Sequence, residues 1–519
     1  MFNGITHFNQ NSTLWFKRRI PTERFLCKGL KKPLITVALF FLSVCFMSAY
    51  GQRQEWSNSR KLKGTAVFTK VLGENGNGVF LMRYRNRFFT RSVIVEKYRN
   101  HLGFSFSRNI SLRKSRLVSL ELNEEGLLFF TAGYNKSTLQ NELIAQYYDF
   151  NVLAKTKPRV ISTALLSEGY DRGDFRVQAS SDLKRYAVSF TEKSIKGNRI
   201  LHFKMLDLEL RELKSNAFEI PVKYEDFISV DFQTDHQGRV YLLMKEKSKT
   251  SRKGERTWEP WRLFCWNSVS DQLSDYALND SGVFLQKAKI SIDRQREEVL
   301  VTAFYSNMGP DGFSGMYLFR LFNHPSLAPT RTFSKFSKDI MVDLIGERHE
   351  EDESEAYEFE QLKAVPMSHG GITVVSERAS MSSEEDVIYV NGIPQNTSRN
   401  IYNFDEVFVL SLDSSGKIVW HKMINKSQSS MNDGGYYSSV IVGVTQDNIH
   451  IIFNDKMRGN GNVMQYSING KGVMSDVILL RSDREYLSVI PAESKQISSN
   501  KLLIPVSRDK KFALLKLIY

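Results

Sequence analysis

Apolar and polar residues alternate along most of this chain in short runs, and clusters of Asp, Asn, Ser and Gly separate the runs. The stretch 174–213 is representative, because polar turns divide apolar-alternating runs at 175–179, 185–190 and 200–206. Runs of four to eight residues with a period of two indicate β-strands, and short turns between them indicate an antiparallel meander. This stretch therefore predicts consecutive hairpins.

The same order of strand, Asp/Asn/Gly turn and strand recurs in eight units, whose second strands begin near residues 79, 127, 185, 240, 299, 371, 449 and 502. The mean spacing of about 60 residues is wider than the ~40–45 of WD40 repeats. A four-stranded unit repeated radially is a β-propeller, which avoids long exposed sheet edges. We predict an all-β protein, a propeller of seven or eight four-stranded antiparallel blades, and the count favours eight.

Two features of this fold prediction stay open. Two stacked β-sandwich domains would also explain the strands, although not their recurring order. The last unit shows three strands only, and a strand near Gly64 to Leu72 could complete it and close the ring.

Two short segments resemble known propeller repeats. Ser180-Ser181-Asp182-Leu183-Lys184-Arg185-Tyr186-Ala187 is similar to the Ser-Pro-Asp-Gly-Lys turn of TolB-like repeats, with Pro and Gly replaced. The segment 412–420, Leu-Asp-Ser-Ser-Gly-Lys-Ile-Val-Trp, resembles the outer hairpin of quinoprotein-like repeats. The resemblance is to the β-propeller repeat superfamily at the level of the fold, and it implies no functional residue.

The first 51 residues have the pattern of a targeting segment. Lys28, Lys31 and Lys32 precede an apolar run at 34–50, and Ala49 and Gly51 stand at the positions that a signal peptidase reads. We expect a signal peptide at 1–51, cleaved before Gln52, followed by a linker at 52–63 and the propeller at 64–519. Retention of 34–50 as a single membrane anchor is the alternative.

Cysteine usage and charge refine this picture of an exported protein. Without 1–51, one cysteine, Cys265, is left of three, and the net charge falls from +14 to +8. A secreted chain without internal disulfides fits the periplasm, cell surface or exterior of a Gram-negative bacterium better than a eukaryotic extracellular setting. The remaining positive charge is modest for this length.

A basic segment next to tryptophans is the candidate ligand surface. Basic residues beside aromatic rings are typical of polysaccharide and nucleic-acid surfaces, and export argues against nucleic acid. A basic loop with tryptophans packed into a strand is the alternative interpretation. The candidate residues are Lys245, Lys247, Arg252, Lys253, Trp258 and Trp261.

Long loops are expected at 245–259, 305–313, 336–360 and 376–404. Within the third of them, six acidic residues between Glu347 and Glu360 could offer oxygen ligands to Ca²⁺. The run lacks a glycine-bearing turn, so we interpret it as a solvated loop. The turn-rich segment 432–437, Asn-Asp-Gly-Gly-Tyr-Tyr, is first of all turn chemistry.

No standard catalytic signature occurs in the sequence: it has no Gly-x-Ser-x-Gly elbow, no His-Glu-x-x-His pair and no phosphate-binding loop. We therefore expect no cofactor and no metal, and a binding or scaffold role for an envelope protein or glycan through loops on one face. A secreted hydrolase or lyase acting on polysaccharide is the alternative. Two or three carboxylates, or a metal-binding His, converging on the central axis would favour that enzyme.

Overall fold

The computed structural model describes residues 52–61, 68–84, 92–112, 115–165, 175–247, 259–324, 326–346, 355–390, 393–457, 461–481, 488–508 and 511–519. Contacts divide the chain into two compact units, Met1–Gln52 and Arg53–Tyr519, and all described strands lie in the second. The expected signal peptide at 1–51 falls outside the described residues. Among those described, none of the helices has the length and apolar content needed to cross a bilayer.

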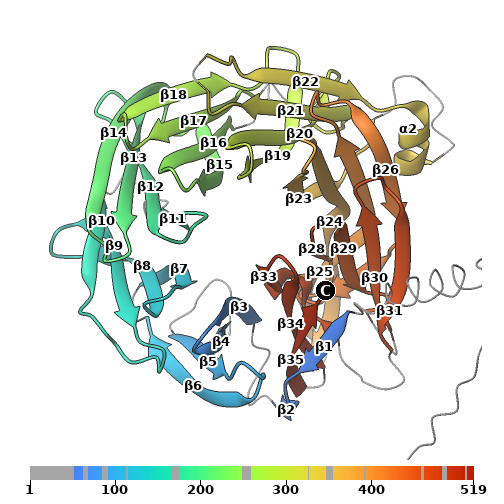
Figure 1. Ribbon diagram of the computed structural model, residues 1–519, viewed down its shortest axis with the longest axis horizontal. Coiled ribbons are helices and arrows are strands. Elements are labelled where there is room, and N and C mark those ends of the chain that lie inside the picture. The colour runs from blue at the N-terminus through green and yellow to red at the C-terminus, as the bar shows by residue number, and fades with distance from the viewer. Residues whose placement is uncertain are drawn as a thin grey trace, which may run out of the picture. The chain divides into compact units, whose positions relative to one another are not determined.

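The second unit is built from eight antiparallel sheets that follow one another around an axis, as Figure 1 shows. In each of blades 1 to 4, the four strands follow one another in chain order from the axis outward. They are β3 (Phe68–Asn75), β4 (Gly78–Tyr84), β5 (Ser92–Tyr98) and β6 (Phe104–Ser111); β7 (Arg116–Leu122), β8 (Leu127–Asn135), β9 (Gln140–Tyr148) and β10 (Arg159–Leu165); β11 (Arg176–Ala179), β12 (Arg185–Lys193), β13 (Asn198–Asp207) and β14 (Glu212–Lys223); β15 (Phe227–Thr234), β16 (Arg239–Glu246), β17 (Trp261–Asn267) and β18 (Gln272–Ala277).

Blades 5 to 7 repeat this order, and blade 6 carries one additional short strand, β27, paired with β25. Their strands are β19 (Phe284–Asp293), β20 (Glu298–Ser306), β21 (Gly315–Leu321) and β22 (Thr330–Lys335); β23 (Phe359–Pro366), β24 (Ile372–Val390), β25 (Ile393–Leu412), β26 (Ile418–Ile424) and β27 (Gln428–Met431); β28 (Ile441–Val444), β29 (Asn448–Asn454), β30 (Val463–Asn469) and β31 (Met474–Leu480). The predicted all-β propeller is confirmed, with eight blades, and the expected second strands begin within one residue of the observed ones.

Blade 8 is completed by the start of the second unit. It contains β32 (Ser488–Val489) and β33 (Lys495–Ser498) on β34 (Lys501–Arg508), followed by β35 (Lys511–Ile518), and a 3₁₀ turn at Pro491–Glu493. The outer partners of β35 are β1 (Arg53–Trp56) and β2 (Arg60–Lys61). The closing strand is therefore Arg53–Trp56, inside the expected linker at 52–63, and not the stretch near Gly64 to Leu72. That stretch runs into β3, the innermost strand of blade 1.

The core consists of eight apolar clusters, and each one joins two neighbouring blades. The last cluster packs Val71 and Leu81 of blade 1 against Leu503 and Leu514 of blade 8, so that the ring is closed by burial as well as by strand pairing. Because a middle strand is covered on both faces, β20 is buried along nearly its whole length, whereas the outermost β18 is mostly exposed. Sharing of burial between neighbours explains why the second strand of each unit is the most apolar.

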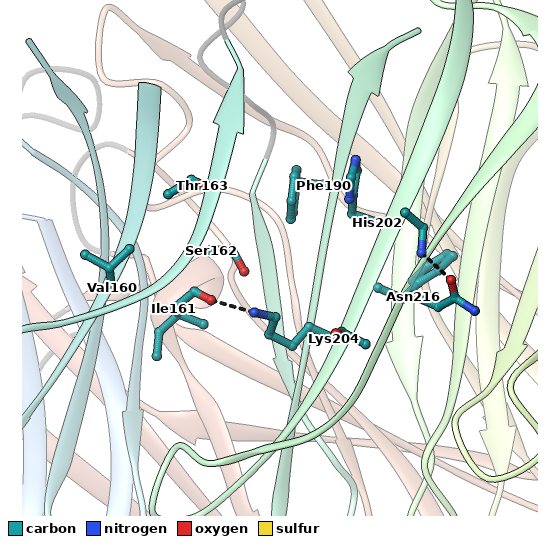
Figure 2. A pocket seen from close by; sticks show the side chains of 11 residues that line it. Val160, Ile161, Ser162, Thr163, Phe190, His202, Lys204 and Asn216 are labelled. Carbon is teal, nitrogen blue, oxygen red and sulfur yellow. Dashed lines mark hydrogen bonds between the residues drawn. The ribbon is translucent and has the colours of Figure 1, made fainter. Parts of the chain in front are cut away.

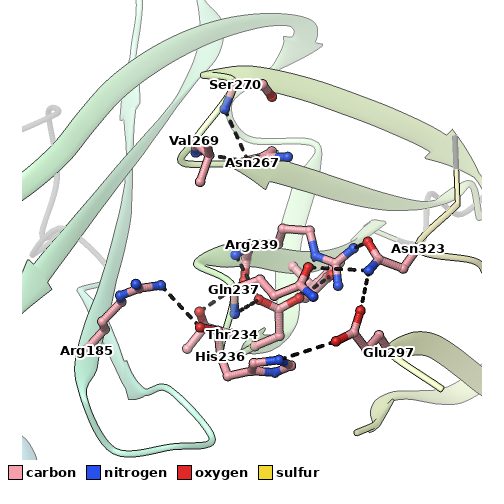
Figure 3. Close-up of polar contacts among 12 residues, drawn as sticks. Arg185, Thr234, His236, Gln237, Arg239, Asn267, Val269, Ser270, Glu297 and Asn323 are labelled. Atoms are coloured by element: carbon pink, nitrogen blue, oxygen red, sulfur yellow. Dashed lines mark hydrogen bonds and ion pairs between the residues drawn. The ribbon is translucent and has the colours of Figure 1, made fainter. Parts of the chain in front are cut away.

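The two ends of the sheets differ in their connections. At one end, which we call the short-turn face, lie the turns between first and second strands and between third and fourth strands. In four consecutive blades the first turn is closed by its own side chain: the carboxylate or amide oxygens of Asn123, Asp235 and Asp293 and the hydroxyl of Ser180 accept backbone N–H groups within the turn. Neighbouring turns also touch, as Figure 3 shows for Asn323, which contacts Gln237 and Glu297.

The opposite end, the long-loop face, carries the links between second and third strands and between successive blades. The segments expected as long loops, 245–259, 305–313, 336–360 and 376–404, all follow a second or a fourth strand, and antiparallel strand order assigns such connections to this end. Two of them contain regular structure: helix α2 (Lys338–Ile345) lies within 336–360, and 376–404 is not a loop. The latter prediction is wrong because β24 and β25 continue as one ladder from Ile372↔Leu412 to Val390↔Ile393, although the polar composition resembles that of a loop.

Candidate functional site

The long-loop face is the candidate functional site, and its most prominent element is the ribbon formed by the outer parts of β24 and β25 (381–400). The partner strand β23 pairs with β24 no further than Arg378, and β27 pairs with β25 over Phe404 to Ile401. Asn400 is bonded at this edge to Asn432, whose N–H donates to its carbonyl and whose side-chain oxygen accepts its N–H, both at 2.9 Å. Beyond these points, among the described residues, the two strands pair only with each other. Met381 and Val387 are 65% and 50% exposed. Unpaired strand edges are templates for association, so the ribbon has the chemistry of an interaction arm.

A buried polar cluster supports the base of this ribbon. Glu377 of β24 and Lys426, just after β26, form an ion pair at 2.9 Å with both side chains 0% exposed. Lys426 Nζ also donates to the carbonyl oxygen of Phe404 at 2.5 Å and to Gln428 Oε1 at 3.2 Å. The Ser439 hydroxyl donates to the other Glu377 oxygen, from a backbone with a φ of 71°. The side chains at the base of the ribbon therefore fix one another.

Burial dominates the titration of this pair. Desolvation lowers the pKa of Lys426, although the neighbouring Glu377 carboxylate opposes the change. Desolvation likewise raises the pKa of Glu377, and Lys426 and the Ser439 hydroxyl oppose it. Each buried charge is compensated by the other, and removal of either one would leave an unpaired ion in the interior. The pair therefore holds the base of β24 against the segment that follows β26.

The cluster continues from blade 6 toward blades 7, 8 and 1 through the segment 425–440. Gln428 Nε2 donates to the Asn454 carbonyl at 2.7 Å, and Asn454 Nδ2 donates to the carbonyls of Tyr437 and Val489 at 2.7 and 2.9 Å. The Tyr436 hydroxyl accepts the Thr69 backbone N–H of blade 1 at 3.1 Å. The turn chemistry predicted at 432–437 is confirmed by the positive φ of Asn432, Gly434 and Gly435. Its tertiary role is to join four blades on the long-loop face.

The charged residues of the inner strands connect neighbouring blades. The ammonium groups of Lys289, Lys363 and Lys495 donate to the carbonyls of Leu362, Val442 and Leu72 on the next blade, at 3.1, 3.2 and 2.6 Å. Burial lowers the pKa of all three lysines. The carboxylate of Asp231 accepts the backbone N–H groups of Phe232 and Ile290 at 2.8 and 2.9 Å. These groups hold the ring together, and among the described residues no three metal-ligating side chains form a group.

The predicted ligand surface is only partly described. Lys245 Nζ pairs with Glu259 at 3.2 Å and lies 5.6 Å from the ring centre of Trp261, and Lys247 is exposed. Trp261 is 2% exposed within the core between blades 4 and 5, so it offers no surface to a ligand, and the alternative of strand packing applies to it. Arg252, Lys253 and Trp258 lie outside the described residues, as do residues 347–354 of the acidic run.

Sequence reasoning missed the buried cluster. Glu377 and Lys426 are 49 positions apart in the sequence, and each is followed by polar residues along the chain. A charged residue in such a stretch is expected to be exposed to solvent. The one available signal was the turn-rich segment 432–437, whose length exceeds what a connection between adjacent strands needs.

Comparisons with known proteins bear on the fold alone. No family model matches the sequence, and no curated protein matches it. Among solved structures, the chain is similar to the polysaccharide lyase Uly1 at 10% identity and a TM-score of 0.39, covering 88% of this chain and 99% of that one. It is also similar to the WD40 domain of SCAP from fission yeast, at 9% identity and a TM-score of 0.37, with 90% and 98% covered. The propeller domain of the Trilobed protease from Pyrococcus furiosus gives 8% identity and a TM-score of 0.33, with 81% and 94% covered. The propeller assignment rests on the strand order and the eight interfaces described above.

Proposed function

We propose that this protein is an exported, noncatalytic binding module whose long-loop face engages an envelope protein or glycan. The observation that carries the proposal is the ribbon at 381–400: a two-stranded arm with unpaired edges, held at its base by a fully buried ion pair. An isolated two-stranded hairpin is at best marginally stable in water, so an ordered, exposed one is suited to gain a partner.

The inner strands support a binding role over the polysaccharide-acting enzyme. Three of their lysines, Lys289, Lys363 and Lys495, donate to backbone carbonyls of the neighbouring blade, and Asp231 accepts a backbone N–H there. An acid–base mechanism would need such groups to be directed at a substrate. A rigid ring with variable loops at one end is a scaffold on which binding surfaces are readily built.

The test is co-sedimentation of the purified protein with bacterial envelope fragments. A variant in which 384–399 is replaced by Asn-Gly keeps the Ser383↔Asn400 pair and removes the arm. We expect at least a tenfold loss of bound protein for this variant. The matched control replaces 324–328 on the short-turn face by Asn-Gly and should bind like the wild type.

Treatment of the fragments separates the two kinds of partner. Loss of binding after protease treatment indicates a protein, and loss after periodate oxidation indicates a glycan. Equal binding by the arm-deleted variant would contradict the proposal, and release of reducing ends or unsaturated sugars from the fragments would favour the hydrolase or lyase.

A further inference from the structure

A pocket in the outer wall between blades 2 and 3 is separate from the ribbon. It has a volume of about 430 Å³, within the size range of small-molecule sites, and Figure 2 shows its lining side chains. One wall is the outermost strand of blade 2, β10, and the other walls are β12, β13 and β14 of blade 3. The pocket therefore opens where two blades diverge.

A β-bulge shapes the β10 wall. The pairing of β10 with β9 shifts register between Val160 and Ser162, so that Ile161 is the extra residue. Bulges re-aim side chains and free a carbonyl from the ladder. The Ile161 carbonyl accepts Lys204 Nζ of β13 at 2.8 Å, as Figure 2 shows, and Lys204 also pairs with Glu212 at 3.0 Å.

A second cross-blade contact holds the other end of this segment. Glu192 of β12 accepts the Leu165 backbone N–H at 2.6 Å and contacts His202 Nε2 at 2.7 Å. Burial alone would raise the pKa of Glu192, but the hydrogen bonds from His202 and Leu165 lower it below its usual range. The segment between the two contacts is thereby fixed, and it presents Ser162 and Thr163 to the pocket.

Two features of the lining indicate what it would accept. Ser162 is 7% exposed, and its hydroxyl has no hydrogen-bond partner among the described residues. Beside it, the imidazole of His202 stacks on Phe190, with ring centres 4.3 Å apart and planes 4° apart. A buried hydroxyl without a partner is costly unless a bound group or water satisfies it. Lys204 is paired with Glu212, and Glu192 is paired with His202. No unpaired charge among these residues is therefore left to attract an ionic ligand.

We propose that this pocket binds one neutral sugar residue of a glycan. Pyranose rings combine hydroxyl groups, which would hydrogen-bond Ser162 and Thr163, with an apolar C–H face suited to flat rings such as the His202–Phe190 stack. The Asn216 amide, which lines the same pocket, already donates to Asp271 and accepts the Ala217 N–H. The site is independent of the ribbon on the long-loop face. It can therefore be present whether the ribbon binds a protein, a glycan or neither.

The test is a titration of the purified protein with glucose, galactose and N-acetylglucosamine, one at a time. Binding is detected by saturation-transfer NMR of the sugar protons. We expect a Kd of about 1 mM for at least one of them, which is the affinity expected of a ligand of this size. The Ser162→Ala variant should weaken that affinity about fivefold, the effect of one neutral hydrogen bond. Ala217→Trp adds bulk at an exposed lining position and should abolish binding without a change in the core.

Ser274→Ala is the matched control, because Ser274 is an exposed serine on the outermost strand of blade 4. Its affinity for the sugar should equal that of the wild type. The proposal would be overturned if none of the three sugars received saturation from the wild-type protein. It would also be overturned if the Ala217→Trp variant transferred saturation to a sugar as strongly as the wild type does. Binding of glucuronate in place of the neutral sugars would also overturn it, since it would show an anion site at Lys204. Deletion of 384–399 should leave this titration unchanged, so its result is distinguishable from that of the ribbon.

Discussion

The short-turn face and the long-loop face of the propeller use polar residues in opposite ways. On the short-turn face an Asp, Asn or Ser closes its own turn within a few residues, as Asp413 does by accepting the N–H groups of Ser415 and Lys417 at 2.8 and 3.0 Å. On the long-loop face Glu377, Lys426 and Asn454 connect segments far apart in sequence and are buried. The difference shows that hydrogen bonds within a few residues form the turns at the strand ends. Polar contacts between distant segments instead position the long-loop face, which is the proposed binding surface.

The largest expected effect is the loss of one partner of the buried ion pair. Lys426→Met leaves the Glu377 carboxylate buried and without its cation, which should lower the free energy of unfolding by about 3–5 kcal/mol. Urea denaturation followed by circular dichroism measures this change. The control is Lys155→Met on the short-turn face, whose exposed pair with Glu125 at 2.6 Å should contribute less than about 1 kcal/mol.

A double variant sharpens the first prediction. Lys426→Met combined with Glu377→Leu removes both charges, and it should recover most of the lost stability because no buried ion is left unpaired. Equal destabilisation by the single Lys426→Met and Lys155→Met substitutions would show that the two faces do not differ as described.

The next effect depends on pH and concerns His450, near the start of β29 at the short-turn end. Its ring stacks on Tyr519 at 3.9 Å, and burial lowers its pKa to about 4. Between this value and the ordinary value near 6.5, the unfolded chain binds more protons than the folded one, so stability falls as the pH falls through this window. The loss should reach up to about 3 kcal/mol at the acidic end.

Thermal unfolding between pH 7 and pH 4 measures this contribution of His450. The His450→Gln variant should lose part of the acid sensitivity, because the amide does not titrate. His324, in the connection between β21 and β22, offers a control: His324→Gln should keep the wild-type pH profile. An unchanged profile in His450→Gln would contradict the prediction.

The smallest effect is the removal of one turn acceptor. Asp413→Ala deprives two turn N–H groups of their acceptor and should cost about 1 kcal/mol, because water can replace part of the lost hydrogen bonding. Asp413→Asn keeps an acceptor oxygen and should retain most of the stability in the same urea titration. A loss as large as that of Lys426→Met would remove the contrast between local turns and the buried cluster.

Much of the fold was predictable because blade formation depends on local signals. The alternation of apolar residues set the strands, and Asp182, Asp235 and Asp293 marked the turns within a few residues of the strands that they join. Two predictions that relied on composition were wrong. Polar composition predicts a loop at 376–404, where the structure has a hairpin whose described residues beyond Met381 are largely exposed. The four-residue strand β1, Arg-Gln-Glu-Trp, is too short and too polar to be distinguished from a linker by its sequence.

The candidate site was predictable only as a location. Sequence order alone places 245–259, 336–360 and 376–404 at the same end of an antiparallel blade. It does not reveal that Trp261 is buried, since an aromatic residue of an alternating strand is compatible with either face. Nor does it pair Glu377 with Lys426 or place Ser162 beside His202, because these contacts join different strands or different blades.

The sequence by itself determined the all-β character and the positions of the short turns, since both follow from hydrophobic periodicity and turn propensity within about ten residues. The recurrence of this pattern favoured eight blades over seven, and the structure has eight. The tertiary structure decided which strand closes the ring, which charges are buried and where a pocket opens. Those outcomes depend on distances between segments that are remote along the chain, and such distances are fixed only when neighbouring blades share their apolar faces.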